Sequence, residues 1–273
     1  MMEQEIYWYW LNNIEGIGRV AIRRLLEEYE DPCYIYEDAE DREIAFLLQT
    51  LDLSGYQASK DRDHLQREYE NLQKKGVTFT YPGKNDYPER LCCIPDAPLG
   101  LYYKGTLPEE TQKAIAIIGA RNCSRYGMEM ARFFGRELAK CDIAVISGLA
   151  RGIDGMGHKG ALEGNGYTLG ILGCGVDIVY PTENYELFMK MERQGGILSE
   201  SNIGIQPFAG LFPQRNRLIA GMSDGILVIE AREKSGTFIT VDQGLEQGQE
   251  IFALPGKLTD PKSAGCNNLI KFG

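Results

Sequence analysis

This sequence is short of the residues that most metal and cofactor sites require. It has only two histidines, His64 and His158, and its seven cysteines include no Cys-x-x-Cys pair. We therefore expect no zinc site and no other metal site, and we interpret the cysteines as reduced thiols. The dinucleotide fingerprint Gly-x-Gly-x-x-Gly is missing after the first apolar strand-like run, and no Gly-x4-Gly-Lys-Ser/Thr loop occurs. Neither a dinucleotide cofactor nor a P-loop nucleotide site is predicted.

Long apolar runs are also missing. No stretch reaches the 18 or so apolar residues that a membrane-spanning helix needs. The first residues, MMEQEIYWYW, place acidic side chains before the aromatics and contain no apolar signal core. We predict a cytoplasmic protein that has no signal peptide and does not contact a membrane.

Positive charge is scarce overall, but the deficit is uneven. The formal net charge is −10, and residues 1–80 hold 9 Lys and Arg against 17 Asp and Glu. Residues 119–220 hold 11 Lys and Arg against 10 Asp and Glu. An acidic chain is a poor general binder of polyanions, but the central segment leaves room for a local phosphate pocket.

The chain divides into a helical part and an alternating part. The stretch EIYWYWLNNIEGIGRVAIRRLLEEY predicts two helices joined by a glycine hairpin, and a further helix over 61–75 ends at Gly76. Composition then shifts towards proline and aromatics. We predict a small all-α domain over 1–80, of the SAM or helix-hairpin-helix kind, and a second domain over 81–273.

The second domain alternates strands with helices. Apolar strand-like runs AIAIIGA, DIAVISG, YTLGILGCG, GGILSE, GILVIEA and EIFALPG are separated by helical stretches. Strands that are apolar on both faces and alternate with helices indicate a parallel sheet covered on both sides. The predicted class is α/β, an extended Rossmann-like, doubly wound and mostly parallel sheet.

Four strand-to-helix loops have the composition of phosphate cradles. Helix starts offer free N–H groups, glycine allows close approach, and arginine adds a forked donor. Two alternatives stay open: each loop is a structural turn with a surface charge, or Arg215 and Arg217 pair with acids such as Asp224 or Glu230. The four loops are GARNCSRYG, SGLARGID, FPQRNRLIAG and SGTFIT, the last contributing Ser235 and Gly236.

Asp154 and His158 lie four residues apart on one predicted helix. They could form an acid–base couple, but we favour a structural interpretation in which Asp154 caps helix N–H groups and His158 lies on the surface or against the sheet. No nucleophile with an adjacent base is evident. We therefore predict a protein that is not an enzyme.

Long stretches resemble the DprA/Smf family of DNA-processing proteins, and the resemblance covers nearly all of residues 87–273. It implies a Rossmann-like domain that binds single-stranded DNA and delivers it to the RecA recombinase during natural transformation (competence) and recombination. It also implies a homodimer formed by the C-terminal side of this domain, around residues 250–270, and no cofactor. The matching stretches are AIIGARNCSRYG, SGLARGID, ALEGNGYTLGILGCGVDIVYPTEN, GGILSESNIGIQP, FPQRNRLIAGMSD, VIEAREKSGTFIT, FALPGKLTDPKSAGCNNLI and YPERLCCIPDAPLGLYYKG.

The resemblance assigns DNA-phosphate contacts by position. Phe212 is a candidate for stacking on a base and equally a candidate core residue. The assigned residues are Gly119 and Arg121 in the first loop, Ser147, Gly148, Arg151 and Gly152 in the second, and Arg215, Asn216 and Arg217 in the third.

Two features depart from the family pattern. The sequence ends at LIKFG, where many members continue into a small winged-helix-like domain, so that domain is expected to be absent or truncated. The hairpin IEGIG resembles a phosphate-binding helix-hairpin-helix, but the acidity of residues 1–80 favours a structural hairpin or a protein-docking surface.

Two functions are alternatives to DNA binding: a nucleotide-processing enzyme and a nucleotide-sensing module, each of a related Rossmann-like fold.

Overall fold

The computed structural model describes residues 2–50 and 52–272, and the chain forms two compact units. The first unit comprises Met1–Tyr87 and Pro98–Leu101, and the second comprises Pro88–Ala97 and Tyr102–Gly273. The segment after residue 80 is therefore shared: part of it packs with the N-terminal helices and part with the sheet. Aromatic side chains cause this division, because Phe79 packs edge-on against Tyr9 at 5.6 Å and its ring also lies against Gly100.

The first unit is helical, as expected. The predicted helix–hairpin–helix is α1 followed by α2, and the turn between them contains Gly16 at φ +78°. The core is aromatic: Trp10 is buried and packs edge-on against Tyr36, with ring centroids 4.9 Å apart. The elements are α1 (Gln4–Asn12), α2 (Arg19–Tyr29), α3 (Pro32–Glu37), α4 (Asp41–Leu48), α5 (Ser54–Ala58), α6 (Arg62–Lys74) and the short strand β1 (Thr78–Thr80).

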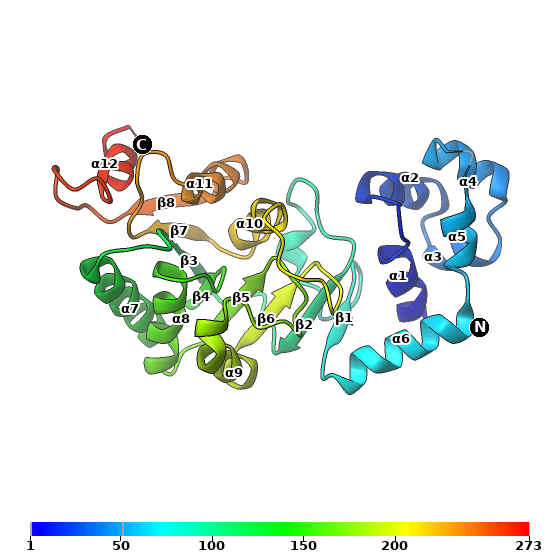
Figure 1. Ribbon diagram of the computed structural model, residues 1–273, viewed down its shortest axis with the longest axis horizontal. Helices are drawn as coiled ribbons and strands as arrows, with labels where there is room; N and C mark the ends of the chain where they lie inside the picture. Colours follow the sequence, from blue (N-terminus) through cyan, green and yellow to red (C-terminus); the bar gives the residue numbers. More distant parts are fainter. Residues whose placement is uncertain (1, 51, 273) are drawn as a thin grey trace. The chain divides into compact units, whose positions relative to one another are not determined.

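The second unit contains the predicted α/β sheet. Its strands lie in the order β2-β6-β5-β4-β3-β7-β8 (Figure 1). From β6 to β8 all neighbours are parallel, whereas β2 runs antiparallel to β6. The strands are β2 (Leu101–Gly105), β3 (Ala114–Ile118), β4 (Ala144–Ser147), β5 (Thr168–Leu172), β6 (Gly196–Ser199), β7 (Gly225–Val228) and β8 (Glu250–Ala253).

The sheet is doubly wound about β3. Successive strands β4, β5 and β6 lie on one side of β3, and β7 and β8 lie on the other. Because parallel crossovers are right-handed, helices α7 to α9 cover one face and α10 and α11 cover the opposite face (Figure 1). The helices are η1 (Glu89–Leu91), α7 (Arg125–Lys140), α8 (Ile153–Glu163), η2 (Thr182–Asn184), α9 (Tyr185–Gln194), α10 (Leu211–Gly221), α11 (Thr237–Glu246) and α12 (Ala264–Phe272).

Glycines set the close packing of α7 on α8. A Cβ on Gly135 would lie 3.1 Å from the Ala161 nitrogen, and a Cβ on Gly160 would lie 2.9 Å from the Arg132 carbonyl carbon. The two helices therefore approach backbone to backbone at these glycines. Within residues 2–50 and 52–272, no helix combines the length and apolar character that crossing a membrane requires.

Candidate functional site

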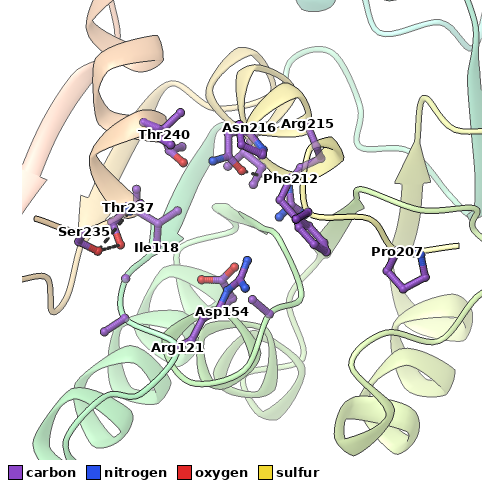
Figure 2. Close-up of a pocket in the computed structure, with 18 of the residues that line it drawn as sticks. Ile118, Arg121, Asp154, Pro207, Phe212, Arg215, Asn216, Ser235, Thr237 and Thr240 are labelled. Carbon is purple, nitrogen blue, oxygen red and sulfur yellow. Dashed lines mark hydrogen bonds between the residues drawn. The ribbon is translucent and has the colours of Figure 1, made fainter.

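A cleft of about 640 Å³ opens at the carboxyl ends of β3, β4 and β7 (Figure 2). Neighbouring strands β3 and β7 send their chains to opposite faces of the sheet, and open parallel sheets bind ligands at such a switch point. The loop after β3, the start of α8, the chain entering α10 and the start of α11 all reach the cleft. The residues that line it include Gly119, Arg121, Asp154, Tyr180, Phe212, Arg215, Asn216, Ser235, Gly236 and Thr237.

Arg121 lies on the loop after β3 and is exposed. Its guanidinium carbon is 5.2 Å from the centroid of the Phe212 ring, which places the cation over an aromatic face. Phe212 also stacks with Tyr180, with centroids 5.7 Å apart and planes inclined at 25°. Phe212 is thus half-buried at the cleft wall rather than in the core, and Arg121 has an aromatic surface beside it.

Arg215 comes from the first half of α10 and is only 7% exposed. Its Nη1 donates to the Gly148 carbonyl at 3.0 Å and also to the Ile171 carbonyl, and its Nε donates to Asn216 Oδ1 at 3.2 Å. Burial lowers the pKa of Arg215 to about 10, although the negative charge of Asp154 opposes the shift. The guanidinium remains charged at neutral pH and places a fixed positive charge in the cleft wall.

Neither cleft arginine is neutralised by an acid. Among the described residues, Arg121 and Arg215 form no ion pair with a carboxylate. A charged group that is buried without a partner is costly, so Arg215 is held by carbonyl oxygens in place of a counter-ion. The lining of the cleft therefore holds two arginines against one carboxylate, that of Asp154, although the chain as a whole is acidic.

Two of the four predicted cradles are already occupied by carboxylates of the chain itself. At the start of α7, the Glu230 carboxylate accepts from the Ser124 N–H at 2.9 Å. In the loop before α8, the Asp154 carboxylate accepts from the Gly148 N–H at 3.2 Å. These two sites are negatively charged without a ligand.

The other two helix starts carry no such charge. α10 begins after Gly210 and has no side-chain cap. α11 begins after Gly236, where the Ser235 hydroxyl accepts from the Thr237 N–H at 3.3 Å, and an added Cβ on Gly236 would meet nothing within 4 Å. The positive ends of α10 and α11 are therefore open to an anion in the cleft.

The second predicted loop forms a smaller cavity of about 40 Å³ next to the cleft, which Gly148 and Arg151 line. Arg151 is exposed and pairs with Glu183 at 2.6 Å. Ser147 is fully buried, and its hydroxyl donates to the Ile117 carbonyl at 2.6 Å. Gly152, at φ +76°, allows the chain to pass close to the carbonyl of Arg121. Ser147 and Gly152 shape the loop and do not line either cavity.

Arg217 lies away from both cavities. It is 6% exposed, and its Nη2 donates to both Glu200 carboxylate oxygens at 2.8 Å, while its Nε lies 3.5 Å from Asp96 Oδ2. The acids considered from the sequence have other partners: Asp224 pairs with Lys113, and Glu230 accepts from Ser124. A DNA contact by Arg217 stays a prediction that this geometry does not favour.

The pair Asp154 and His158 is not an acid–base couple. His158 is fully buried against the sheet, and its Nδ1 lies 2.7 Å from the Thr168 hydroxyl of β5. Burial and the charge of Arg215 lower the pKa of His158 to about 3, so the imidazole is neutral. Burial raises the pKa of Asp154, which contacts the Gly148 loop instead. The structural interpretation of this pair holds for His158, which faces the sheet.

Tyr180 and Thr237 are cleft residues that the sequence did not identify. Tyr180 lies two residues before η2 and stacks on Phe212 at the cleft, and no local motif marks it. Thr237 follows the Ser-Gly pair directly and could have been included with it.

The seven cysteines are unbridged, and no group of three or more His, Cys, Asp or Glu in the described parts of the chain is placed to hold a metal ion.

The fold and the cleft together define a Rossmann-like protein with a cationic cleft at its topological switch point. Residues 78–273 match the family model of the DNA recombination-mediator protein A family. The chain belongs to this family. Protein Smf of Synechocystis sp. is 35% identical over 281 residues, an alignment that covers 99% of this chain and 69% of that protein.

Two solved structures of relatives are also similar. DNA processing protein A from Streptococcus pneumoniae superposes with a TM-score of 0.84 at 31% identity, covering all of this chain and 94% of that one. DNA processing protein A from Helicobacter pylori, a structure that gives insights into the unique single-stranded DNA binding mode of that protein, has a TM-score of 0.64 at 28% identity. That match covers 72% of this chain and 89% of the other.

Proposed function

We propose that this chain binds single-stranded DNA in the switch-point cleft and delivers it to a RecA-type recombinase during DNA uptake and recombination in the cytoplasm. The observation that carries the proposal is the pair of arginines, Arg121 and Arg215, which converge on one cleft and form no ion pair with a carboxylate of the described residues. The single-stranded DNA binding mode described for the Helicobacter pylori relative supports the same assignment.

The cleft offers the two kinds of contact that a single strand needs. Phosphate oxygens would be held by Arg121, Arg215 and Asn216. The open start of α10, and that of α11 at Ser235 and Gly236, would add backbone N–H donors. The stacked rings of Phe212 and Tyr180 offer a face to unpaired bases, and every base can stack. Bases of a duplex are already stacked within the helix, so an aromatic wall favours single strands.

A second set of contacts would extend from the cleft into the adjoining smaller cavity. Arg151 would exchange its exposed ion pair with Glu183 for a phosphate there, whereas Gly148 would only shape the cavity, because its N–H is bonded to Asp154 and its carbonyl to Arg215. Exposed ion pairs contribute little stability, so this exchange costs little. Gly119, Ser147 and Gly152 would shape the two loops that present these groups.

We propose a binding role rather than catalysis, and self-association through the C-terminal side of the sheet. Strand β8 is the last strand of the sheet order, and its Phe252 is 50% exposed. Leu258 is 91% exposed and Ile270 is 52% exposed in the following segment. Large apolar side chains exposed beside an unpaired strand edge support a homodimer interface around residues 250–270.

The test replaces Arg121 with alanine. We expect Arg121→Ala to weaken binding of labelled oligo-dT about tenfold or more, because a charge-assisted phosphate contact is lost. The slope of log affinity against log salt should fall by about 0.7, the value for one phosphate contact on a single strand. Fluorescence anisotropy at several salt concentrations measures both quantities.

The matched control is Arg125→Ala. Arg125 stands four residues later, is exposed and pairs with Glu129 at 2.9 Å, but it does not line the cleft. The substitution Arg125→Ala removes the same charge from the same region, and it should leave the affinity for oligo-dT within about twofold of wild type. Equal effects of the two substitutions would show that the cleft is not the binding site.

A further inference from the structure

Glu230 holds both ends of the segment that carries Arg121. It follows β7 and is only 3% exposed. Its carboxylate accepts from the Ser124 N–H at 2.9 Å and from the Ser124 hydroxyl at 2.5 Å, and its backbone carbonyl accepts from the Ala120 N–H at 2.8 Å. One residue thus ties residues 120 and 124 to the neighbouring strand, with Arg121 between them.

The Glu230 carboxylate also fills the anion site at the start of α7. Ser124 is the N-cap of this helix, and its hydroxyl accepts from the Gly127 N–H at 3.0 Å. A Cβ on Gly127 would lie 2.7 Å from Glu230 Oε2, so the carboxylate rests directly on the first turn. A DNA phosphate cannot occupy the same place.

This carboxylate has no cationic partner. Among the described residues, Glu230 forms no ion pair with Lys, Arg or His. Burying an unpaired carboxylate is unfavourable unless hydrogen bonds satisfy it, and here the donors all come from Ser124. The helix dipole of α7 adds to these bonds. The bonds fix the geometry of a loop whose other end carries the exposed cleft cation.

We propose that Glu230 is the positioning residue for Arg121 in DNA binding. The inference rests on the proposed function and adds a role to a residue that does not itself line the cleft. Glu230 fixes the 120–124 loop before the ligand arrives, so that Arg121 lies beside Phe212 without ordering on binding. It follows that phosphates bind at Arg121, Arg215 and the starts of α10 and α11, and not at the start of α7.

The sign of the effect separates positioning from simple electrostatics. Removing a negative charge near a polyanion site should tighten binding if charge alone matters. If Glu230 positions Arg121, Glu230→Ala should weaken binding, because the loop loses its anchor at Ser124 and keeps only the backbone bond at Ala120. Glu230→Gln keeps an acceptor for the Ser124 N–H and a hydrogen-bonding partner for the hydroxyl, so it should bind as tightly as wild type or slightly tighter.

A double-mutant cycle on the full chain tests the inference. The variants are Glu230→Ala, Arg121→Ala and the double substitution, and anisotropy gives the affinity for labelled oligo-dT over a salt series. We expect Glu230→Ala to reproduce most of the loss of Arg121→Ala, about five- to tenfold, with the same fall in salt slope. The double variant should bind no more weakly than Arg121→Ala.

Other outcomes overturn the inference in distinguishable ways. If the two losses multiply in the double variant, or if Glu230→Ala keeps the wild-type salt slope, Glu230 does not act through Arg121. If Arg121→Ala binds as wild type, the proposed binding site itself is wrong and the inference is lost with it. Should Glu230→Ala not fold, as a circular dichroism spectrum would show, Ser124→Ala replaces it in the same cycle with the same expected non-additivity.

Discussion

Arg215 and Arg217 stand two positions apart on α10, and both are buried, yet their surroundings differ. Arg217 meets Glu200 and is neutralised by it, whereas Arg215 meets the carbonyls of Gly148 and Ile171. The sequence places both arginines at the start of one helix and cannot separate them, because Gly148 lies 67 residues from Arg215, and Glu200 and Asp96 lie 17 and 121 residues from Arg217. Only tertiary structure shows which arginine keeps an unmatched charge.

At the scale of a residue, the burial of His158 also makes the stability of the fold depend on pH. Its pKa is lowered from 6.5 to about 3 by burial, so the unfolded chain binds a proton at a higher pH than the native chain does. The stability that neutral His158 contributes is complete above pH 6.5 and is lost as the pH falls from 6.5 towards 3. The slope reaches about 1.4 kcal/mol per pH unit. The raised pKa of Asp154 acts in the opposite direction.

The substitution His158→Asn should reduce this acid sensitivity. Between pH 7 and pH 5, wild type should lose about 2 kcal/mol more unfolding free energy than the variant, because asparagine does not titrate. Urea unfolding followed by far-ultraviolet circular dichroism measures the difference. Tryptophan fluorescence is unsuitable because Trp8 and Trp10 both lie in the first unit. The prediction would be contradicted if wild type and His158→Asn lost equal unfolding free energy between pH 7 and pH 5. It would also be contradicted if substitution of the exposed His64 by asparagine had the same effect as His158→Asn.

At the scale of elements, the pattern of apolar residues along the sequence was sufficient to predict most strands of the sheet. The apolar runs at 114–120, 142–148 and 225–231 contain β3, β4 and β7, and the helix predicted after the first run is α7. Strand β2 escaped prediction because Leu101–Gly105 lies in a proline- and aromatic-rich segment and pairs antiparallel with β6. Such pairing depends on a partner nearly a hundred residues away, which local pattern does not encode.

The contact of α7 with α8 makes a prediction about Gly135. Alanine favours a helix over glycine by about 1 kcal/mol, so propensity alone predicts that Gly135→Ala is stabilising. The packing predicts the reverse, because the new Cβ would press on the Gly157 carbonyl and lie 3.1 Å from the Ala161 nitrogen. We expect a net loss of about 1–3 kcal/mol, the usual cost of overpacking.

Thermal unfolding followed by circular dichroism measures the effect of Gly135→Ala. Gly236→Ala is the matched substitution, because its Cβ would meet nothing within 4 Å and φ at this residue is −60°. It should shift the midpoint far less. A Gly135→Ala protein as stable as wild type would mean that α7 and α8 can separate without cost.

At the scale of the whole molecule, the position of the cleft was predictable and the details of its lining were not. Parallel strands alternating with helices require a doubly wound sheet, and loops at the carboxyl ends of its strands converge on one edge. Gly119, Arg121, Arg215 and Ser235 were identified by that rule and line one cleft. The sequence could not show that Glu230 and Asp154 fill two of the helix starts, since both carboxylates reach loops set by the tertiary fold.

The two units also differ in how their charges are distributed. The first unit is strongly acidic, while the cleft of the second unit holds two arginines that form no ion pair within residues 2–50 and 52–272. Nucleic acid should therefore bind the second unit alone, and binding should depend steeply on salt although the chain carries a net charge of −10.

The most direct test of DNA binding is the anisotropy of a labelled oligo-dT length series in rising salt, with a duplex of equal length as competitor. We predict affinity that increases with length until the cleft is spanned, weakens as salt rises, and is little affected by duplex. Absence of binding at every length, together with tight binding of a mononucleotide, would contradict a DNA-binding role and assign the cleft to a nucleotide ligand.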